Sequence, residues 1–131
     1  MAARMSGHHY FRSFGYCDSG MIPWLLVSSL LSAADTNLSE LINHRRRAYP
    51  ASGEINMAVA DPGTVLATLA EHYRDGAMSR VDGLSVAYPS FVFNVRASTT
   101  EPLLRLNIET RGDVALLQEK TAELTALIKA V

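Results

Sequence analysis

The sequence predicts an α+β protein: a C-terminal domain with the element order β-α-β-β-β-α, preceded by two helices. Three observations lead to this prediction. Several segments after residue 53 alternate apolar and polar residues like half-buried strands, and others there repeat their apolar residues with the helical period. The first fifty residues instead hold two apolar helix patterns and no convincing strand. We expect an antiparallel sheet with helices on one face, preceded by two helices from an incomplete α/β domain.

The first helix is expected over residues 21–34. Asp18 or Ser19 can cap it, and its first turn tolerates Pro23. Apolar residues lie almost all round this helix, which is typical of a helix buried on more than one side. We therefore expect it to dock on the rest of the chain, or on a second copy of the chain through the stretch from Ile22 to Leu31.

A second helix is expected over residues 38–47, capped by Thr36 or Asn37. The stretch "AYPASG" then breaks it and has the composition of a linker. The expected domains are residues 1–50 and residues 51–131.

Strands and helices alternate after this linker. Ile55, Met57 and Val59 mark a strand, and Asp61 followed by Pro62 predicts the cap and first position of a helix. Three further strands are expected over residues 84–88, 91–96 and 103–109, and a last helix begins after Gly112-Asp113.

Composition excludes several classes of protein. Of the 131 residues, 48% are apolar, which is enough for a core, and a net charge of -1 argues against a general nucleic-acid binder. The longest apolar run has 14 residues, fewer than the roughly 20 that span a bilayer. A lone Cys17 fits a reducing compartment, and the N-terminus has no signal-peptide pattern. We expect a cytoplasmic protein with neither nucleic-acid nor membrane partners.

The loop "RASTTEP" between the last two strands has an unusual hydrogen-bonding capacity. Arg96, Ser98, Thr99 and Thr100 offer one guanidinium fork and three hydroxyls within five residues, which is what a phosphate site requires. A hydroxyl-rich turn that satisfies its own backbone is the alternative, and local chemistry alone favours it.

A second polar loop, "SGHH", lies near the N-terminus. His8 and His9 are adjacent, so on an extended chain their side chains point to opposite faces, and no third ligand follows nearby. We expect no metal site here. His8 is a candidate contact for a sugar or a phosphate.

Three stretches together resemble the C-terminal part of the α-D-phosphohexomutases, closest to the bacterial phosphomannomutase/phosphoglucomutase branch. They are "MSGHHYF…YCDSGMIPWLLV", "YPASGEIN" and "FNVRASTTEPLLRLNIETRGD". The resemblance covers nearly the whole chain, and the motifs keep the family's order and spacing. It implies a four-domain enzyme of which this chain would be the end of domain 3 and all of domain 4.

The enzyme implied by this resemblance moves phosphate between O1 and O6 of a hexose phosphate through a bisphosphorylated sugar. It uses Mg²⁺ and glucose 1,6-bisphosphate. Carried onto this chain, the distal phosphate site falls on Arg96, Ser98, Thr99 and Thr100. Thr99 stands where the family usually has Asn, so this position keeps a donor but has a shorter reach.

The family's sugar-recognition loop falls on Met5, Ser6, Gly7 and His8. Arg4 replaces the family's Glu, and because arginine has no acceptor, the usual contact with sugar hydroxyls cannot be made there. Met5 and Gly7 also favour this branch over the phosphoglucosamine mutases, which remain an alternative.

The chain contains neither a phosphoserine loop nor an Asp-x-Asp-x-Asp metal loop. We therefore expect no metal site, no bound cofactor and no catalytic residue beyond His8 in an accessory role, and we expect the chain alone to be inactive. Its partners would be a hexose phosphate and the remaining parts of domains 1–3. The alternative from a different class is a stand-alone interaction module without sugar chemistry.

Overall fold

The computed structural model describes residues 2–3, 8–98 and 101–131. The chain divides into two compact units, Met1–Asn43 and His44–Val131, and each is described here by itself. No helix in the described ranges is both long and apolar enough to cross a membrane.

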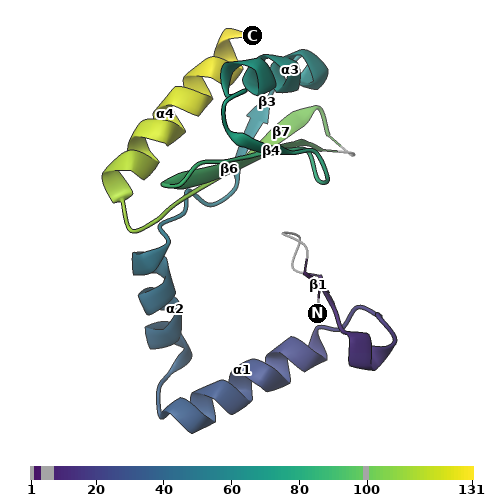
Figure 1. Ribbon diagram of the computed structural model, residues 1–131, viewed down its shortest axis with the longest axis vertical. Coiled ribbons are helices and arrows are strands. Elements are labelled where there is room, and N and C mark those ends of the chain that lie inside the picture. Colours follow the sequence, from purple (N-terminus) through teal and green to yellow (C-terminus); the bar gives the residue numbers. More distant parts are fainter. Residues whose placement is uncertain (1, 4–7, 99–100) are drawn as a thin grey trace. The chain divides into compact units, whose positions relative to one another are not determined.

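The N-terminal unit begins with two short strands, β1 (Ala2–Ala3) and β2 (His9–Tyr10), which pair antiparallel. The sequence pattern does not reveal them because two residues are too few to show alternation. A 3₁₀ turn, η1 (Arg12–Phe14), and the long helix α1 (Met21–Ala34) follow, and α2 (Leu38–Ala48) begins within this unit (Figure 1).

Both predicted N-terminal helices are confirmed. The N-cap of α1 is Gly20, which has no side-chain cap, while the Ser19 hydroxyl before it accepts the Ile22 N–H at 3.3 Å. At the start of α2 the Asn37 side-chain oxygen accepts the Glu40 N–H at 2.9 Å. The prediction that α1 is buried on more than one side is not met within its own unit, since α1 has no buried residue and Trp24 is 60% exposed. The short unit supplies no second layer to cover this helix.

The C-terminal unit is a five-stranded antiparallel sheet in the order β3-β7-β6-β5-β4. Two helices, α3 (Pro62–His72) and α4 (Val114–Ala130), cover one face (Figure 1). The strands are β3 (Ile55–Ala58), β4 (Ala77–Ser79), β5 (Leu84–Ala87), β6 (Phe91–Ala97) and β7 (Leu103–Thr110). The predicted α+β fold is confirmed. The additional edge strand β4 has three residues, all exposed, and so carries no alternating pattern.

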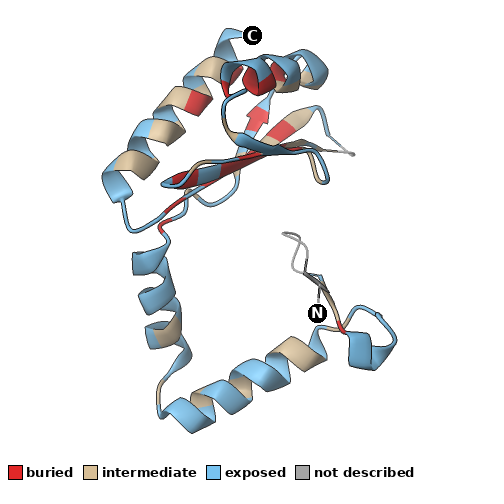
Figure 2. Ribbon diagram, in the orientation of Figure 1, coloured by how far each residue is buried: buried red, intermediate tan, exposed pale blue. Residues whose placement is uncertain are grey.

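The core lies between the sheet and the two helices. Alternate residues of the central strands are buried, among them Phe93 and Val95 on β6 and Leu104 and Leu106 on β7, together with Leu124 of α4 (Figure 2). The residues between them face the side that neither α3 nor α4 covers, because successive side chains of a strand point to opposite faces. This second face, called the open face below, carries Arg96, one of the candidate phosphate residues.

The Asp61 cap predicted for α3 is also confirmed, and Asp113, expected just before the last helix, caps α4. The Asp61 carboxylate accepts the N–H groups of Gly63 and Thr64 at 2.9 and 3.2 Å, and that of Asp113 accepts the Leu116 N–H at 2.8 Å.

A buried tyrosine connects the two helices of this unit. The Tyr73 hydroxyl donates to Glu123 of α4 at 2.6 Å, and Lys120 donates to the same carboxylate at 2.6 Å. Burial, followed by the hydrogen bond to Glu123, raises the pKa of Tyr73 well above its usual value. The hydroxyl therefore remains a donor at all ordinary pH values.

The segment expected as a linker is attached to the sheet. The carbonyl oxygen of Pro50 accepts the Thr110 N–H at 2.9 Å. The Ser52 N–H donates to Ile108 at 2.9 Å, and the Ser52 hydroxyl accepts the Ile108 N–H at 3.0 Å. Residues 50–52 thus run beside β7 as a short extension of the sheet. The proline- and glycine-containing sequence of this segment predicts a linker and does not reveal this pairing.

Candidate functional site

The hydroxyl-rich loop joins β6 to β7 and is closed by its own backbone. The Ser98 N–H donates to the Leu103 carbonyl at 2.9 Å, and the Leu103 N–H donates to the Glu101 carbonyl at 2.8 Å. The Ser98 hydroxyl accepts the Glu101 N–H at 3.3 Å, so part of its capacity is used within the turn. Thr99 and Thr100, two of the four predicted phosphate residues, lie outside the described residues.

Arg96, at the entrance of this loop, lies on the open face of the sheet. It is directly opposite Arg105 in the β6–β7 register. Glu54, which precedes β3, stands by both arginines: its Oε2 is 3.3 Å from Nη2 of Arg96, and its Oε1 is 3.8 Å from Nη1 of Arg105. A polar, net cationic cluster therefore sits beside the loop.

The turn before β5 packs against the backbone that carries Arg96. Gly83 has a φ of +73°, and a Cβ atom built on it would lie 2.4 Å from the Val95 carbonyl oxygen and 2.8 Å from the Arg96 Cα. The buried Asn94 donates to the Asp82 carbonyl and to the Ser85 hydroxyl, both at 2.8 Å. The sequence marks Asp82-Gly83 as a turn, but it does not show that the turn supports the entrance of the candidate phosphate loop.

In the N-terminal unit, His8 is paired with a carboxylate. Its Nδ1 lies 2.5 Å from Oδ2 of Asp18, while Oδ1 of Asp18 accepts the His9 N–H at 3.0 Å. The hydrogen bond with His8, followed by the one from the His9 backbone, holds the pKa of the Asp18 carboxyl below its usual value. A proton on Nδ1 directed at this carboxylate leaves Nε2 to accept a hydrogen bond from a ligand hydroxyl.

Asp18 is a residue that the sequence interpretation assigned differently. We expected Asp18 or Ser19 as the cap of α1. The N-cap is instead Gly20; the Ser19 hydroxyl accepts the Ile22 N–H, and Asp18 pairs with His8. The other predicted residues of the sugar loop, Met5, Ser6 and Gly7, lie outside the described residues, as does Arg4. His8 belongs to the N-terminal unit and Arg96 to the C-terminal unit, and the position of each is described relative to its own unit.

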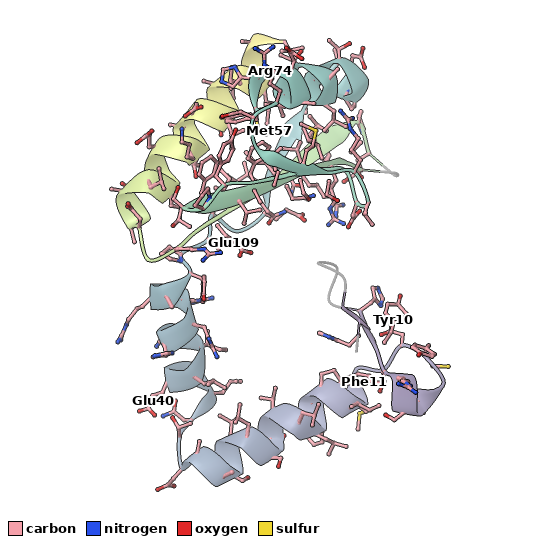
Figure 3. All side chains as sticks on the ribbon, in the orientation of Figure 1. Tyr10, Phe11, Glu40, Met57, Arg74 and Glu109 are labelled. Carbon is pink, nitrogen blue, oxygen red and sulfur yellow. The ribbon has the colours of Figure 1, made fainter. Side chains whose placement is uncertain are left out.

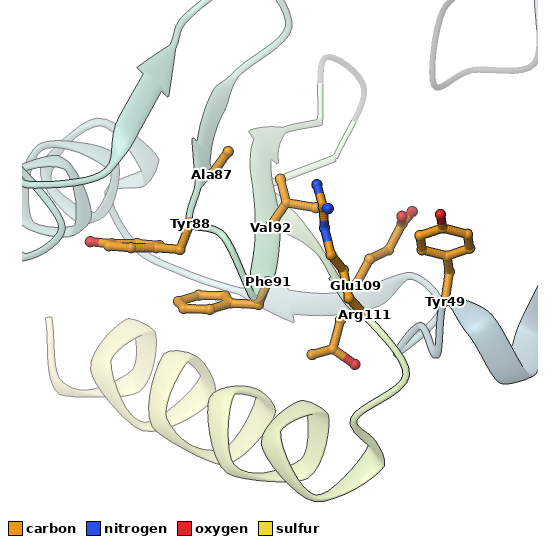
Figure 4. Close-up of a pocket in the computed structure, with 8 residues that line it drawn as sticks. Tyr49, Ala87, Tyr88, Phe91, Val92, Glu109 and Arg111 are labelled. Atoms are coloured by element: carbon orange, nitrogen blue, oxygen red, sulfur yellow. The ribbon is translucent and has the colours of Figure 1, made fainter.

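A separate cavity of about 350 Å³ opens at the end of the β6–β7 hairpin remote from the loop (Figure 4). Phe91, stacked on Tyr88 with 4.8 Å between ring centroids, forms part of its wall. The remaining lining residues are Tyr49, Ala87, Val92, Glu109, Thr110 and Arg111. Of the residues predicted for phosphate or sugar binding, those that the structure describes, His8, Arg96 and Ser98, do not line it.

In the described part of the chain, no group of three or more His, Cys, Asp or Glu side chains is gathered where it could hold a metal ion.

Comparison with protein families gives two matches that together cover most of the chain. The C-terminal domain of phosphoglucomutase/phosphomannomutase matches residues 54–127, and the alpha/beta/alpha domain III of phosphoglucomutase/phosphomannomutase matches residues 2–49.

Individual relatives agree with these matches. The chain is 48% identical over 128 residues to a phosphomannomutase of Salmonella montevideo and 51% identical over 128 residues to one of Vibrio cholerae. It is 48% identical over 127 residues to a protein of Xanthomonas campestris described as phosphohexose mutases. The alignments cover 95 to 96% of this chain but 28% of each relative, so the chain spans a little over a quarter of their length.

Proposed function

The chain belongs to the phosphoglucomutase/phosphomannomutase family, and from this premise we propose that it supplies the site for the non-reacting phosphate of a hexose phosphate. The proposed parent is a cytoplasmic enzyme that moves phosphate between O1 and O6 of the sugar through a bisphosphorylated intermediate. Residues 1–50 would be the end of its third domain and residues 51–131 its fourth.

The observation that carries this proposal is the position of Arg96. Its side chain is 27% exposed on the open face, two residues before Ser98, the first hydroxyl-bearing residue of the loop. A guanidinium presents paired N–H donors to a phosphate, and serine and threonine hydroxyls and backbone N–H groups complete such sites. We assign the phosphate to Arg96 and Ser98 together with Thr99 and Thr100. Both ends of the sugar occupy this site in turn as the intermediate reorients.

His8 has a complementary role in the proposal. With Nδ1 directed at Asp18, its Nε2 can accept a hydrogen bond from a sugar hydroxyl. Met5, Ser6 and Gly7 would form the rest of the sugar contact.

We further propose that the 131 residues bind a hexose phosphate weakly and do not turn it over. The sequence has no phosphoserine loop and no Asp-rich metal loop, and phosphoryl transfer depends on a phosphate donor and on stabilisation of the transferred charge. The described residues do not fit a magnesium ion. Mg²⁺ and glucose 1,6-bisphosphate are therefore assigned to the whole enzyme, and no step on this chain involves them.

The test is a titration of the ¹⁵N-labelled chain with mannose 6-phosphate, followed by amide chemical shifts, with unphosphorylated mannose as the parallel arm. Phosphate-dependent shifts should centre on residues 96–101 and disappear in Arg96→Gln but persist in Arg74→Gln. A silent loop would contradict the proposal and favour the stand-alone interaction module. Turnover in a coupled mutase assay with Mg²⁺ and glucose 1,6-bisphosphate would refute the proposed inactivity.

A further inference from the structure

The cavity at the end of the sheet remote from the hydroxyl-rich loop has an apolar floor on the open face. Ala87, Val92 and Glu109 are cross-strand partners, so they form one row across β5, β6 and β7. All three lie at exposed positions of their strands. The side chains of Ala87 and Val92 supply the apolar part of this row, and Glu109 supplies a carboxylate at its end.

Two opposite charges border this floor without pairing. Arg111 follows β7, and its N–H donates to the Ser90 carbonyl at 3.1 Å, which continues the hairpin by one hydrogen bond. The side chains of Tyr49, Glu109 and Arg111 extend to one side of the hairpin, and that of Phe91 extends to the other (Figure 4). Among the described residues, neither the Glu109 carboxylate nor the Arg111 guanidinium has a hydrogen-bond or ion-pair partner. Both charges are therefore available to a ligand.

Tyr49 borders the cavity from a fixed position. Its N–H donates to the Arg45 carbonyl at 2.8 Å, and the carbonyl of the next residue, Pro50, accepts the Thr110 N–H at 2.9 Å. Tyr49 is 51% exposed, and its hydroxyl has no hydrogen-bond partner in the described part of the chain. An aromatic ring is thus held beside the two free charges before any ligand arrives.

We propose that this cavity binds a free α-amino acid with an apolar side chain. The Arg111 guanidinium pairs with the carboxylate of the amino acid, and Glu109 accepts hydrogen bonds from its ammonium group. The apolar side chain lies on Ala87 and Val92, beside the ring of Tyr49. Glu109 and Arg111 are two residues apart on an extended chain, about 7 Å between Cα atoms, so both reach the adjoining charges of one amino acid.

Charge and size both favour a small zwitterion. A ligand with no charge, or with charge of one sign, would desolvate Glu109 or Arg111 without pairing it. A nucleotide or a sugar bisphosphate would in addition bring its anionic groups toward Glu109. The cavity volume of about 350 Å³ is at the lower end of the roughly 300–1,000 Å³ typical of small-molecule sites. The inference does not depend on the proposed function, because no described residue of the candidate phosphate site lines this cavity.

The experiment titrates the ¹⁵N-labelled 131-residue chain with leucine and follows the amide chemical shifts. Shifts should centre on residues 87, 92 and 109–111, with a Kd on the order of 1 mM, as expected for a ligand this small in an open site. Leucinamide lacks the carboxylate and N-acetylleucine lacks the ammonium group. Each should bind about fivefold more weakly than leucine, the upper loss for one exposed charge pair. Glycine, a zwitterion without an apolar side chain, should give no shift.

Two substitutions test which residue meets which charge. Arg111→Gln should weaken leucine binding about fivefold and leave leucinamide binding unchanged. Glu109→Gln should weaken leucine binding equally and leave N-acetylleucine binding unchanged. The matched controls are Arg74→Gln and Glu71→Gln, an exposed ion pair. Arg74 lies on the helix-covered side of the sheet and Glu109 on the opposite side (Figure 3), so neither control should change the affinity by more than about twofold.

Three results would each overturn the inference. The first is that leucine shifts none of these amides, and the second is that leucine, leucinamide and N-acetylleucine bind equally well. The third is that a blocked tripeptide, acetyl-lysyl-leucyl-glutamyl amide, binds here while leucine does not, which would make the cavity a docking site for a protein segment. The comparison of ligands uses the unsubstituted chain, so it decides the question even where a variant does not fold.

Discussion

Gly83→Ala is the substitution that most directly tests how the fold supports the candidate phosphate site. The glycine has a φ of +73°, and its Cβ position lies 2.4 Å from the Val95 carbonyl oxygen and 2.8 Å from the Arg96 Cα. Both are backbone atoms, so no side-chain rotation can relieve the overlap. The substitution must therefore displace the turn, or the strand that carries Arg96.

The expected loss of stability has two parts. A left-handed backbone costs alanine about 1–2 kcal/mol, and an overpacked contact that forces backbone shifts costs about 1–3 kcal/mol. The sum, about 2–5 kcal/mol, is a large fraction of the 5–15 kcal/mol that stabilises a typical domain. Displacement of Arg96 should also weaken phosphate binding by about threefold, since the guanidinium no longer meets the loop at its original place.

Gly112→Ala is the matched control. Gly112 has a φ of +70°, but the nearest atom to its Cβ position is the Ala48 carbonyl oxygen at 4.0 Å. Alanine at this position therefore has the free-energy cost of a left-handed backbone but does not overlap neighbouring atoms. Denaturant titration measures the free energy of unfolding of both variants. That of Gly83→Ala should be lower than that of Gly112→Ala by about 1–3 kcal/mol, the cost of the overpacked contact alone.

Two outcomes would refute this reasoning. Equal free energies of unfolding for the two variants would mean that the turn does not press on the strand. A large loss of stability in Gly83→Ala with unchanged phosphate affinity, measured where the variant is still folded, would mean that the turn does not position Arg96.

Two further predictions concern acid stability and association. Burial alone would raise the pKa of Glu123, but hydrogen bonds from Lys120 and Tyr73 outweigh it and hold this pKa below 4.5. Because the folded-state pKa is depressed, the stabilisation is present above pH 4.5 and is lost as the pH falls through the folded value. Denaturant midpoints should fall with acidification below pH 4.5, and less steeply in Glu123→Gln; parallel curves would contradict this. We also expect the exposed apolar surface of α1 to drive self-association, and Leu26→Glu should weaken it in light scattering. A monomeric unsubstituted chain at high concentration would contradict this prediction.

Much of the fold follows from local sequence signals. The bounds of α1, the Asp61-Pro62 start of α3 and the alternation along β6 and β7 are each encoded within a few residues, and all are confirmed. The edge strand β4 is missed because its three residues are exposed, so neither burial nor alternation marks it.

The site is less accessible from sequence because its contacts are not local. That Arg96 faces Arg105 depends on the hairpin register, and the role of Glu54 depends on the pairing of β3 with β7. The pairing of His8 with Asp18 likewise joins residues on both sides of a turn. Residue types suggest phosphate chemistry, but only the three-dimensional arrangement shows that the arginines compete for one carboxylate.

The attachment of residues 50–52 to β7 has a mechanical consequence. A flexible tether would let the sheet swing independently of the chain before it. Here the chain enters the unit already fastened to β7 by hydrogen bonds at Thr110 and Ile108. β7 is the strand that carries Arg105 and follows the candidate phosphate loop. Any displacement of the backbone at residues 50–52 therefore acts directly on β7 through these hydrogen bonds.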